Sequence, residues 1–187
     1  MSNLKIRELA LKGSYEIISK PFIDERGMFA RFFCSNELKD ILKGKKIVNV
    51  NFSQNINKGA IRGLHFQPQP YAEIKMPRCI KGKVLDIIVD VRKDSPTFLK
   101  SISIELSAKN MKMLFVPEGF AHGFQSLEND SQIIYFTTQF FSSGTEMALN
   151  IKDPRLGIKL PIPITQMSDR DSKTPFINEQ NFKGITL

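Results

Sequence analysis

The chain has 187 residues, enough for one domain with a substantial hydrophobic core. Hydrophobic residues make up 41% of it and charged residues 25%, a balance that is typical of globular proteins and excludes a disordered chain. No apolar run is long enough to span a bilayer. Charged side chains interrupt the stretch from Met1 to Ile17, which therefore lacks a signal-peptide core, and we expect a cytoplasmic protein.

The net charge of +8 at pH 7 would suit nucleic acid, an anionic membrane or a small phosphorylated ligand. The basic residues are scattered, and their densest cluster comprises Lys39, Lys43, Lys45 and Lys46. The sequence contains no recognition-helix or aromatic RNA-binding motif. We therefore expect no nucleic-acid or membrane partner. A phosphorylated ligand would need only a few of these charges.

In chain order, the first clear element is a short helix. Ser35 or Asn36 is a suitable N-cap, and the helix is predicted to run to about Lys43. Its apolar face would comprise Leu38, Ile41 and Leu42. The lysine cluster would then lie at the exposed end of this helix.

The rest of the chain is mostly strand-like. Residues 84–92 and 101–106 alternate with a period of two, and residues 133–138 are rich in β-branched and aromatic side chains. In the first of these segments, one face carries Leu85, Ile87, Val89 and Val91, and the other carries Asp86, Asp90 and Arg92. Turn signals recur about every ten residues, and the tail from about residue 161 is irregular, with a possible helix cap at Ser168. The pattern predicts a single all-β domain, residues 1–187, of the sandwich or barrel type.

The chain contains two histidines, and both lie in apolar segments flanked by glycine. His65 lies in residues 61–67. His122 ends a Pro-x-Gly-x-x-His phrase at 117–122 that is typical of the second half of the cupin signature, which favours a jelly roll with a few short peripheral helices. A metal-binding cupin would also need a His-x-His pair and a following glutamate. Since Phe66-Gln67 follow His65, the sequence does not favour a metal site.

Several phrases, in this order and spacing, resemble the RmlC family of dTDP-4-dehydrorhamnose 3,5-epimerases and their relatives. They are residues 24–27, 62–67, Lys75, 82–86, 90–92, 95–97, 106–110, 116–124, Tyr135 and 153–158, with a shorter match at 167–171. The resemblance implies a cupin jelly roll (double-stranded β-helix), a homodimer, and catalysis that needs no metal or organic cofactor. It also implies a nucleotide-diphospho-sugar substrate, a 4-keto-6-deoxy sugar used in deoxysugar and surface-glycan biosynthesis.

The resemblance assigns four catalytic residues. His65 would be the base that removes a proton next to the C4 ketone, because an imidazole accepts protons near neutral pH. Asp171 would orient His65, with Asp169 as the competing choice. Tyr135 would donate a proton on the opposite face, and Lys75 would stabilise the developing oxyanion.

Further matched positions would bind the substrate. Arg62 can bind phosphate oxygens through two hydrogen bonds, and His122 would contact the sugar or its keto oxygen. The remaining positions are Arg26 and Arg170 for the diphosphate, Asn51 and Glu146 as other contacts, and Phe140, where the family often has tyrosine. For Arg26, Arg170, Asn51 and Glu146, surface charge or loop hydrogen bonding is an equal alternative.

Other departures from the family pattern are Arg31 at a glutamate position, 49–51 at a Gln-Asp-Asn run, and the different segment 67–73. These departures gather where the nucleotide base and the periphery of the sugar would be bound. The sequence therefore defines the type of reaction better than the identity of the substrate. The leading hypothesis is a cofactor-independent 3,5-epimerase. The alternatives are a mono-epimerase or ketoisomerase on a related substrate, a non-catalytic sugar-nucleotide-binding cupin, and a metal-dependent cupin oxygenase.

Overall fold

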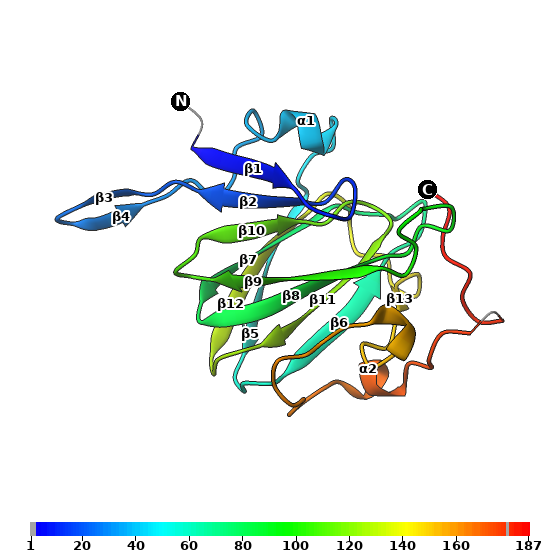
Figure 1. Cartoon of the computed structure of the whole chain (residues 1–187). Coiled ribbons are helices and arrows are strands. Elements are labelled where there is room, and N and C mark those ends of the chain that lie inside the picture. Colours follow the sequence, from blue (N-terminus) through cyan, green and yellow to red (C-terminus); the bar gives the residue numbers. More distant parts are fainter. Residues whose placement is uncertain (1–2, 179) are drawn as a thin grey trace.

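The computed structural model describes residues 3–178 and 180–187 and consists of two facing antiparallel sheets (Figure 1). The six-stranded sheet has the order β1-β2-β10-β7-β12-β5, and the five-stranded sheet has the order β13-β6-β11-β8-β9. A separate hairpin, β3–β4, projects from the body. The all-β prediction is confirmed.

The strands of the six-stranded sheet are β1 (Leu4–Glu8), β2 (Tyr15–Ser19), β5 (Asn49–Asn55), β7 (Lys75–Lys81), β10 (Lys112–Phe115) and β12 (Ser131–Thr137). Those of the five-stranded sheet are β6 (Ile61–Phe66), β8 (Lys83–Asp90), β9 (Ser101–Ser107), β11 (Phe120–Ser126) and β13 (Met147–Ala148). The hairpin comprises β3 (Phe22–Asp24) and β4 (Gly27–Phe29). The helices are α1 (Lys39–Leu42), the 3-10 helix η1 (Pro154–Leu156) and α2 (Asp169–Lys173).

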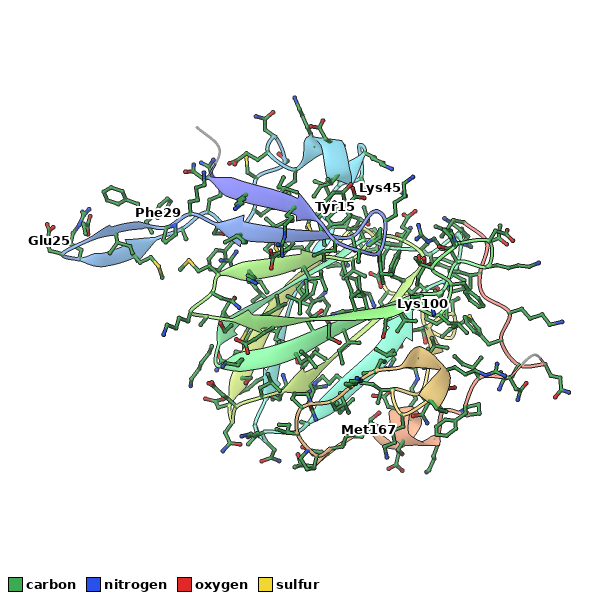
Figure 2. The ribbon with its side chains drawn as sticks, in the orientation of Figure 1. Tyr15, Glu25, Phe29, Lys45, Lys100 and Met167 are labelled. Carbon is green, nitrogen blue, oxygen red and sulfur yellow. The ribbon has the colours of Figure 1, made fainter. Side chains whose placement is uncertain are left out.

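Both faces of β8 are buried, one beneath C-terminal residues and the other between the two sheets. The predicted apolar face contributes Ile87, Val89 and Val91 to a cluster on the outside of the five-stranded sheet, beneath C-terminal residues that include Ile177 and Ile185. The irregular tail therefore completes a hydrophobic layer, because apolar strand faces must be covered. The opposite face of β8 points between the sheets, where residues from both sheets pack: Val84, Ile88, Leu106, Leu114, Phe124 and Ile133. Side chains fill this part of the space between the sheets (Figure 2).

The helix prediction needs a correction at its start. The α-helix begins at Lys39, its N-cap is Leu38, and no side chain caps it, so the expected cap at Ser35 or Asn36 is wrong. Residues 35–38 form turns instead. Leu38 and Leu42 are buried against the outer face of the six-stranded sheet, which indicates that packing of these leucines, rather than a cap, places the helix. The four clustered lysines are exposed, as expected. Within residues 3–178 and 180–187, no helix is long and apolar enough to cross a membrane.

Candidate active site

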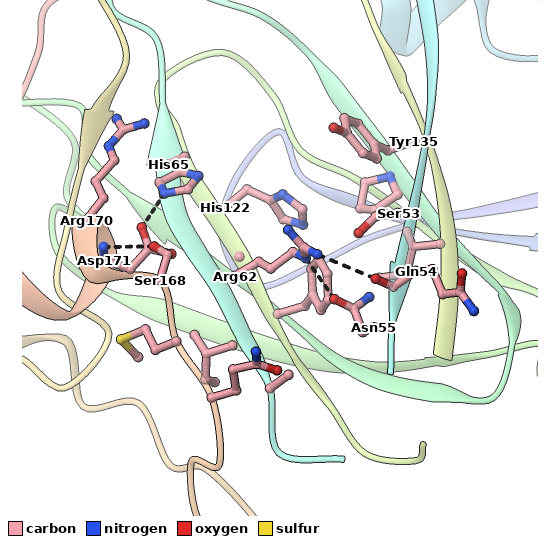
Figure 3. Close-up of a pocket in the computed structure, with 18 of the residues that line it drawn as sticks. Ser53, Gln54, Asn55, Arg62, His65, His122, Tyr135, Ser168, Arg170 and Asp171 are labelled. Atoms are coloured by element: carbon pink, nitrogen blue, oxygen red, sulfur yellow. Dashed lines mark hydrogen bonds and ion pairs between the residues drawn. The ribbon is translucent and has the colours of Figure 1, made fainter. Parts of the chain in front are cut away.

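A cavity of about 900 Å³ opens between the two sheets (Figure 3). Strands β5, β6, β7, β11 and β12 and the segment around α2 contribute to its wall. Eight of the predicted site residues line it: Arg62, His65, Lys75, His122, Tyr135, Glu146, Arg170 and Asp171. The fold thus gathers residues that are up to about a hundred positions apart in the chain.

His65 and Asp171 form a hydrogen-bonded pair, with 2.6 Å between His65 Nε2 and Asp171 Oδ1. Ser168 caps α2 by accepting a hydrogen bond from the Asp171 N–H, and the Gly63 N–H donates to the other Asp171 oxygen. Asp169, the competing choice, points away, with its side chain 91% exposed and paired with Lys173. The structure therefore places Asp171, and not Asp169, on His65.

Asp171 is ionised at neutral pH. Burial alone would favour its neutral form, but the hydrogen bonds from His65 and from the Gly63 N–H, with Ser168, outweigh burial and hold the pKa of Asp171 below its ordinary value. Because an ionised Asp171 can only accept a hydrogen bond, His65 donates to it through Nε2–H. The lone pair of that imidazole is then on Nδ1, the nitrogen nearer to Glu146, at 3.9 Å from Glu146 Oε1.

The two histidines are cross-strand partners, His65 on β6 and His122 on β11. Close approach of two glycines allows this pairing. A Cβ on Gly63 would lie 2.6 Å from the Gly123 Cα, and one on Gly123 would lie 2.5 Å from the Arg62 carbonyl oxygen. Glycine at both positions therefore lets the strands meet where the histidines face the cavity.

Gly123→Ala should destabilise the fold by about 1–3 kcal/mol, the usual cost of overpacking a close contact. The added methyl would force β6 and β11 apart and displace both imidazoles. Urea unfolding measures the first effect, and activity at a temperature where the variant is folded measures the second. A variant as stable as the parent would contradict this account of the glycine pair.

His122 has its own carboxylate partner, Asp86 on β8, at 2.9 Å from His122 Nε2 to Asp86 Oδ1. Asp86 is fully buried, and burial raises its pKa although His122 partly opposes this. The sequence pattern predicted no role for Asp86. The available signal was its place on the polar face of an otherwise apolar strand, the face that points between the sheets.

Lys75 and Tyr135 line the same cavity from neighbouring strands. The ammonium group of Lys75 lies 3.2 Å from Glu73 Oε1 and 3.5 Å from the His65 carbonyl oxygen. Burial raises the pKa of Tyr135, with the negative charges of Glu73 and Glu146 adding to it and Arg62 opposing it. Tyr135 therefore keeps its proton at neutral pH and is suited to act as an acid.

Two arginines present positive charge to the cavity. Arg62 Nε donates to Asn55 Oδ1 at 2.8 Å (Figure 3). Arg170 pairs with Glu146, at 2.5 Å from Nη1 to Oε2. Asn55 was not predicted; the run of polar side chains along β5, Ser53, Gln54 and Asn55, which all line the cavity, is the signal that could have found it.

Three predicted substrate contacts lie outside the residues that line the cavity of this chain. Arg26 is at the exposed turn of the β3–β4 hairpin and pairs with Asp24. Asn51 is opposite Tyr135 in the sheet but beyond the lining residues. Phe140 is largely exposed. The roles of these three residues in substrate binding therefore stay predictions. Among the described residues, no three His, Cys, Asp or Glu side chains are grouped as metal ligands would be.

Comparison with known proteins identifies the family. The sequence model described as dTDP-4-dehydrorhamnose 3,5-epimerase matches residues 8–179. The dTDP-4-dehydrorhamnose 3,5-epimerase of Shigella flexneri is 41% identical over 165 residues, which are 87% of each chain. The chain belongs to the dTDP-4-dehydrorhamnose 3,5-epimerase family. The predicted resemblance is confirmed.

Solved structures similar to this member of the dTDP-4-dehydrorhamnose 3,5-epimerase family share its whole fold. The epimerase RmlC of Legionella pneumophila, in complex with dTDP-4-keto-L-rhamnose, is 30% identical with a TM-score of 0.90 over 98% of this chain and 100% of that one. ChmJ, a 3'-monoepimerase of Streptomyces bikiniensis in complex with dTDP-quinovose, is 29% identical with a TM-score of 0.81 over 90% and 85%. The predicted cupin-type jelly roll is confirmed.

Proposed function

We propose that the protein inverts C3 and C5 of a dTDP-linked 4-keto-6-deoxy sugar, the reaction for which its family is named. The observation that carries the proposal is the His65–Asp171 pair in one cavity with Tyr135 and Lys75. The complex of the Legionella relative with dTDP-4-keto-L-rhamnose supports the substrate class.

The reaction begins with removal of a proton from a carbon next to the C4 ketone. His65 Nδ1 accepts the proton, and the electron pair of the C–H bond moves onto the C4 oxygen to give an enolate. Asp171 stabilises the imidazolium that forms, since it is ionised and hydrogen-bonded to the other ring nitrogen. The positive charge of Lys75 stabilises the enolate oxygen.

Inversion requires that the proton returns from the opposite side. Tyr135 lies on β12, in the sheet that faces the strand of His65, and its raised pKa keeps it protonated until the enolate carbon takes that proton. The enolate collapses to the ketone with the new configuration. Repeating the cycle at the second carbon inverts both, once solvent has restored the protonation states of the two residues.

Arg62 and Arg170 are suited to the diphosphate. Both line the cavity, and a guanidinium binds phosphate oxygens through two parallel hydrogen bonds. Their partners, Asn55 and Glu146, hold them at the wall. We propose that this chemistry needs no metal or organic cofactor. We also propose that the protein lies in the cytoplasm and that its product supplies deoxysugars for surface glycans.

The configuration of the product tests the function. The protein is incubated with dTDP-4-keto-6-deoxy-D-glucose, the product is reduced with borohydride and hydrolysed, and the sugars are separated by chiral gas chromatography. Since inversion at C5 converts a D sugar into an L sugar, 6-deoxy-L sugars are the expected result. Recovery of unchanged D sugars alone would leave a non-catalytic binding protein.

The likeness to a 3'-monoepimerase favours one second candidate, inversion at C3 alone. The same chromatography distinguishes it, because C3 inversion gives a new sugar that keeps the D configuration.

The proposed active form is a homodimer. The β3–β4 hairpin carries four large apolar side chains that are each more than half exposed, namely Phe22, Ile23, Met28 and Phe29. It extends away from the body, with Glu25 at its far end (Figure 2). An apolar projection of this kind is typical of an interface with a second copy. Since Arg26 lies on this hairpin, its predicted contact with a diphosphate would require the cavity of the second copy.

Phe29→Asp should convert the dimer to monomer, because a charge at the centre of an apolar interface is left without a partner. Sedimentation equilibrium measures the mass. Phe176→Asp, which replaces another exposed phenylalanine, is the control and should leave the mass unchanged. A parent protein that sediments as a monomer would contradict the dimer.

A further inference from the structure

Glu73 is a largely buried carboxylate that has no role in the proposed proton transfers. It ends the segment 67–73, whose sequence differs from the rhamnose-pathway pattern. Its Oε1 lies 3.2 Å from Lys75 Nζ, and the two side chains are only 11% and 13% exposed. The backbone on its C-terminal side is fixed, because the Ile74 N–H donates to Thr138 Oγ1 at 2.9 Å. The Lys75 N–H also donates to the Val116 carbonyl oxygen at 3.0 Å. The position of Glu73 is therefore set by the fold.

The charged and titratable groups of the cavity interact with Glu73 from four elements. Burial raises the pKa of Glu73, Lys75 on β7 opposes this, Glu146 before β13 adds to it, and His122 on β11 opposes it. Glu73 in turn contributes to the raised pKa of Tyr135 on β12. Glu73 thus lies within electrostatic reach of the proposed oxyanion partner, the proposed acid and the second histidine.

Lys75 depends on this carboxylate for its placement. A buried ammonium group without a counter-ion is costly, and Lys75 has a flexible four-carbon side chain. The ammonium group also lies 3.5 Å from the His65 carbonyl oxygen, which is at the limit of a hydrogen bond. The short ion pair with Glu73 is therefore the contact that determines where the Lys75 charge lies in the cavity.

We propose that Glu73 is a positioning residue, which holds the Lys75 ammonium group where the enolate oxygen forms and whose main effect on catalysis passes through Lys75. This inference rests on the proposed role of Lys75. Glu73 itself exchanges no proton with the substrate. Its contribution is to fix one charge before the reaction, so that little reorganisation is needed when the enolate appears.

A double-mutant cycle tests this dependence. Glu73→Gln keeps the size of the side chain and removes its charge. In the parent background it should lower kcat about tenfold, as expected when a catalytic charge is displaced, and leave KM within about twofold. In the Lys75→Met background, the same substitution should change kcat little. Glu105→Gln, which removes a carboxylate from the exposed Lys83–Glu105 pair, is the matched control and should have no effect.

The dependence on pH adds a readout that a purely structural role would not move. The ratio of the kcat of the parent to that of Glu73→Gln should fall toward one at acid pH, because the parent also loses the Glu73 charge once its raised pKa is passed. Glu73→Asp, which keeps the charge on a shorter side chain, should recover part of the lost kcat. Melting temperatures of all variants identify any that fail to fold.

The outcomes separate the inference from the function. An equal loss of kcat from Glu73→Gln in both backgrounds, or a parent-like kcat, would overturn the role of Glu73 while leaving the epimerase intact. Full activity of Lys75→Met would overturn the proposed role of Lys75 and the inference together. A loss confined to the Lys75-containing background supports the inference.

Discussion

His65→Asn should lower kcat by about 10²–10⁴-fold, the usual contribution of a positioned acid–base group. Asparagine can still donate a hydrogen bond from its amide N–H to Asp171, so the wall of the cavity is preserved, but it cannot take a proton from carbon. The arginines that are suited to the diphosphate, Arg62 and Arg170, are untouched. Binding of dTDP, measured by calorimetry, should therefore stay within about threefold of the parent.

Substitutions at Asp171 and at the nearby Asp169 test whether His65 acts together with an ionised partner. Asp171→Asn should also lower kcat, since the imidazolium loses its ionised partner. Asp169→Asn, two positions away on the same helix but exposed, should not. If His65→Asn turned over substrate at the parent rate, the base would have to be another group, and the pair at 2.6 Å would be structural.

Tyr135→Phe should abolish inversion yet leave proton exchange. His65 can still remove a proton, exchange it with solvent and return it to the same face of the enolate, whereas phenylalanine has no proton to deliver to the other face. In D₂O, recovered substrate should contain deuterium with unchanged configuration, while epimerisation falls by about 10²–10⁴-fold. NMR of the recovered nucleotide sugar measures both.

Tyr71→Phe is the matched control, because Tyr71 lies outside the residues that line the cavity. It should epimerise at the parent rate. Parent-like inversion by Tyr135→Phe would contradict its assignment as the acid. Simultaneous loss of exchange and inversion would show that Tyr135 is also needed to remove the proton, which contradicts the proposed roles of His65 as base and Tyr135 as acid.

Local sequence patterns predicted the secondary-structure elements better than the tertiary contacts that these elements make. Alternation over residues 84–92 predicted β8 and the division of its side chains between two faces, since a strand places successive side chains on opposite sides. It could not show that both faces are buried, because the layer over the outer face comes from the irregular tail. The start of α1 was wrong for a related reason: burial of Leu38 and Leu42, a tertiary contact, overrode the capping preference of Ser35 and Asn36.

The residues of the site were likewise easier to predict than the contacts between them. The resemblance to the family predicted four catalytic residues, and the structure brings all four to one cavity: His65, Lys75, Tyr135 and Asp171. The His122–Asp86 pair joins residues 36 positions apart on neighbouring strands, and their register is not visible in either local phrase. Glu73 was part of a segment known only to differ from the family pattern, and its pairing with Lys75 appears once both side chains are seen to be buried.

The most direct test of the central claim is proton NMR of dTDP-4-keto-6-deoxy-D-glucose incubated with the parent protein in D₂O, alongside His65→Asn. The parent should exchange the hydrogens at both C3 and C5 for deuterium, and His65→Asn should exchange neither while still binding dTDP. If the parent protein binds the substrate but leaves C3 or C5 without deuterium, even if the other carbon is labelled, the result would contradict 3,5-epimerisation.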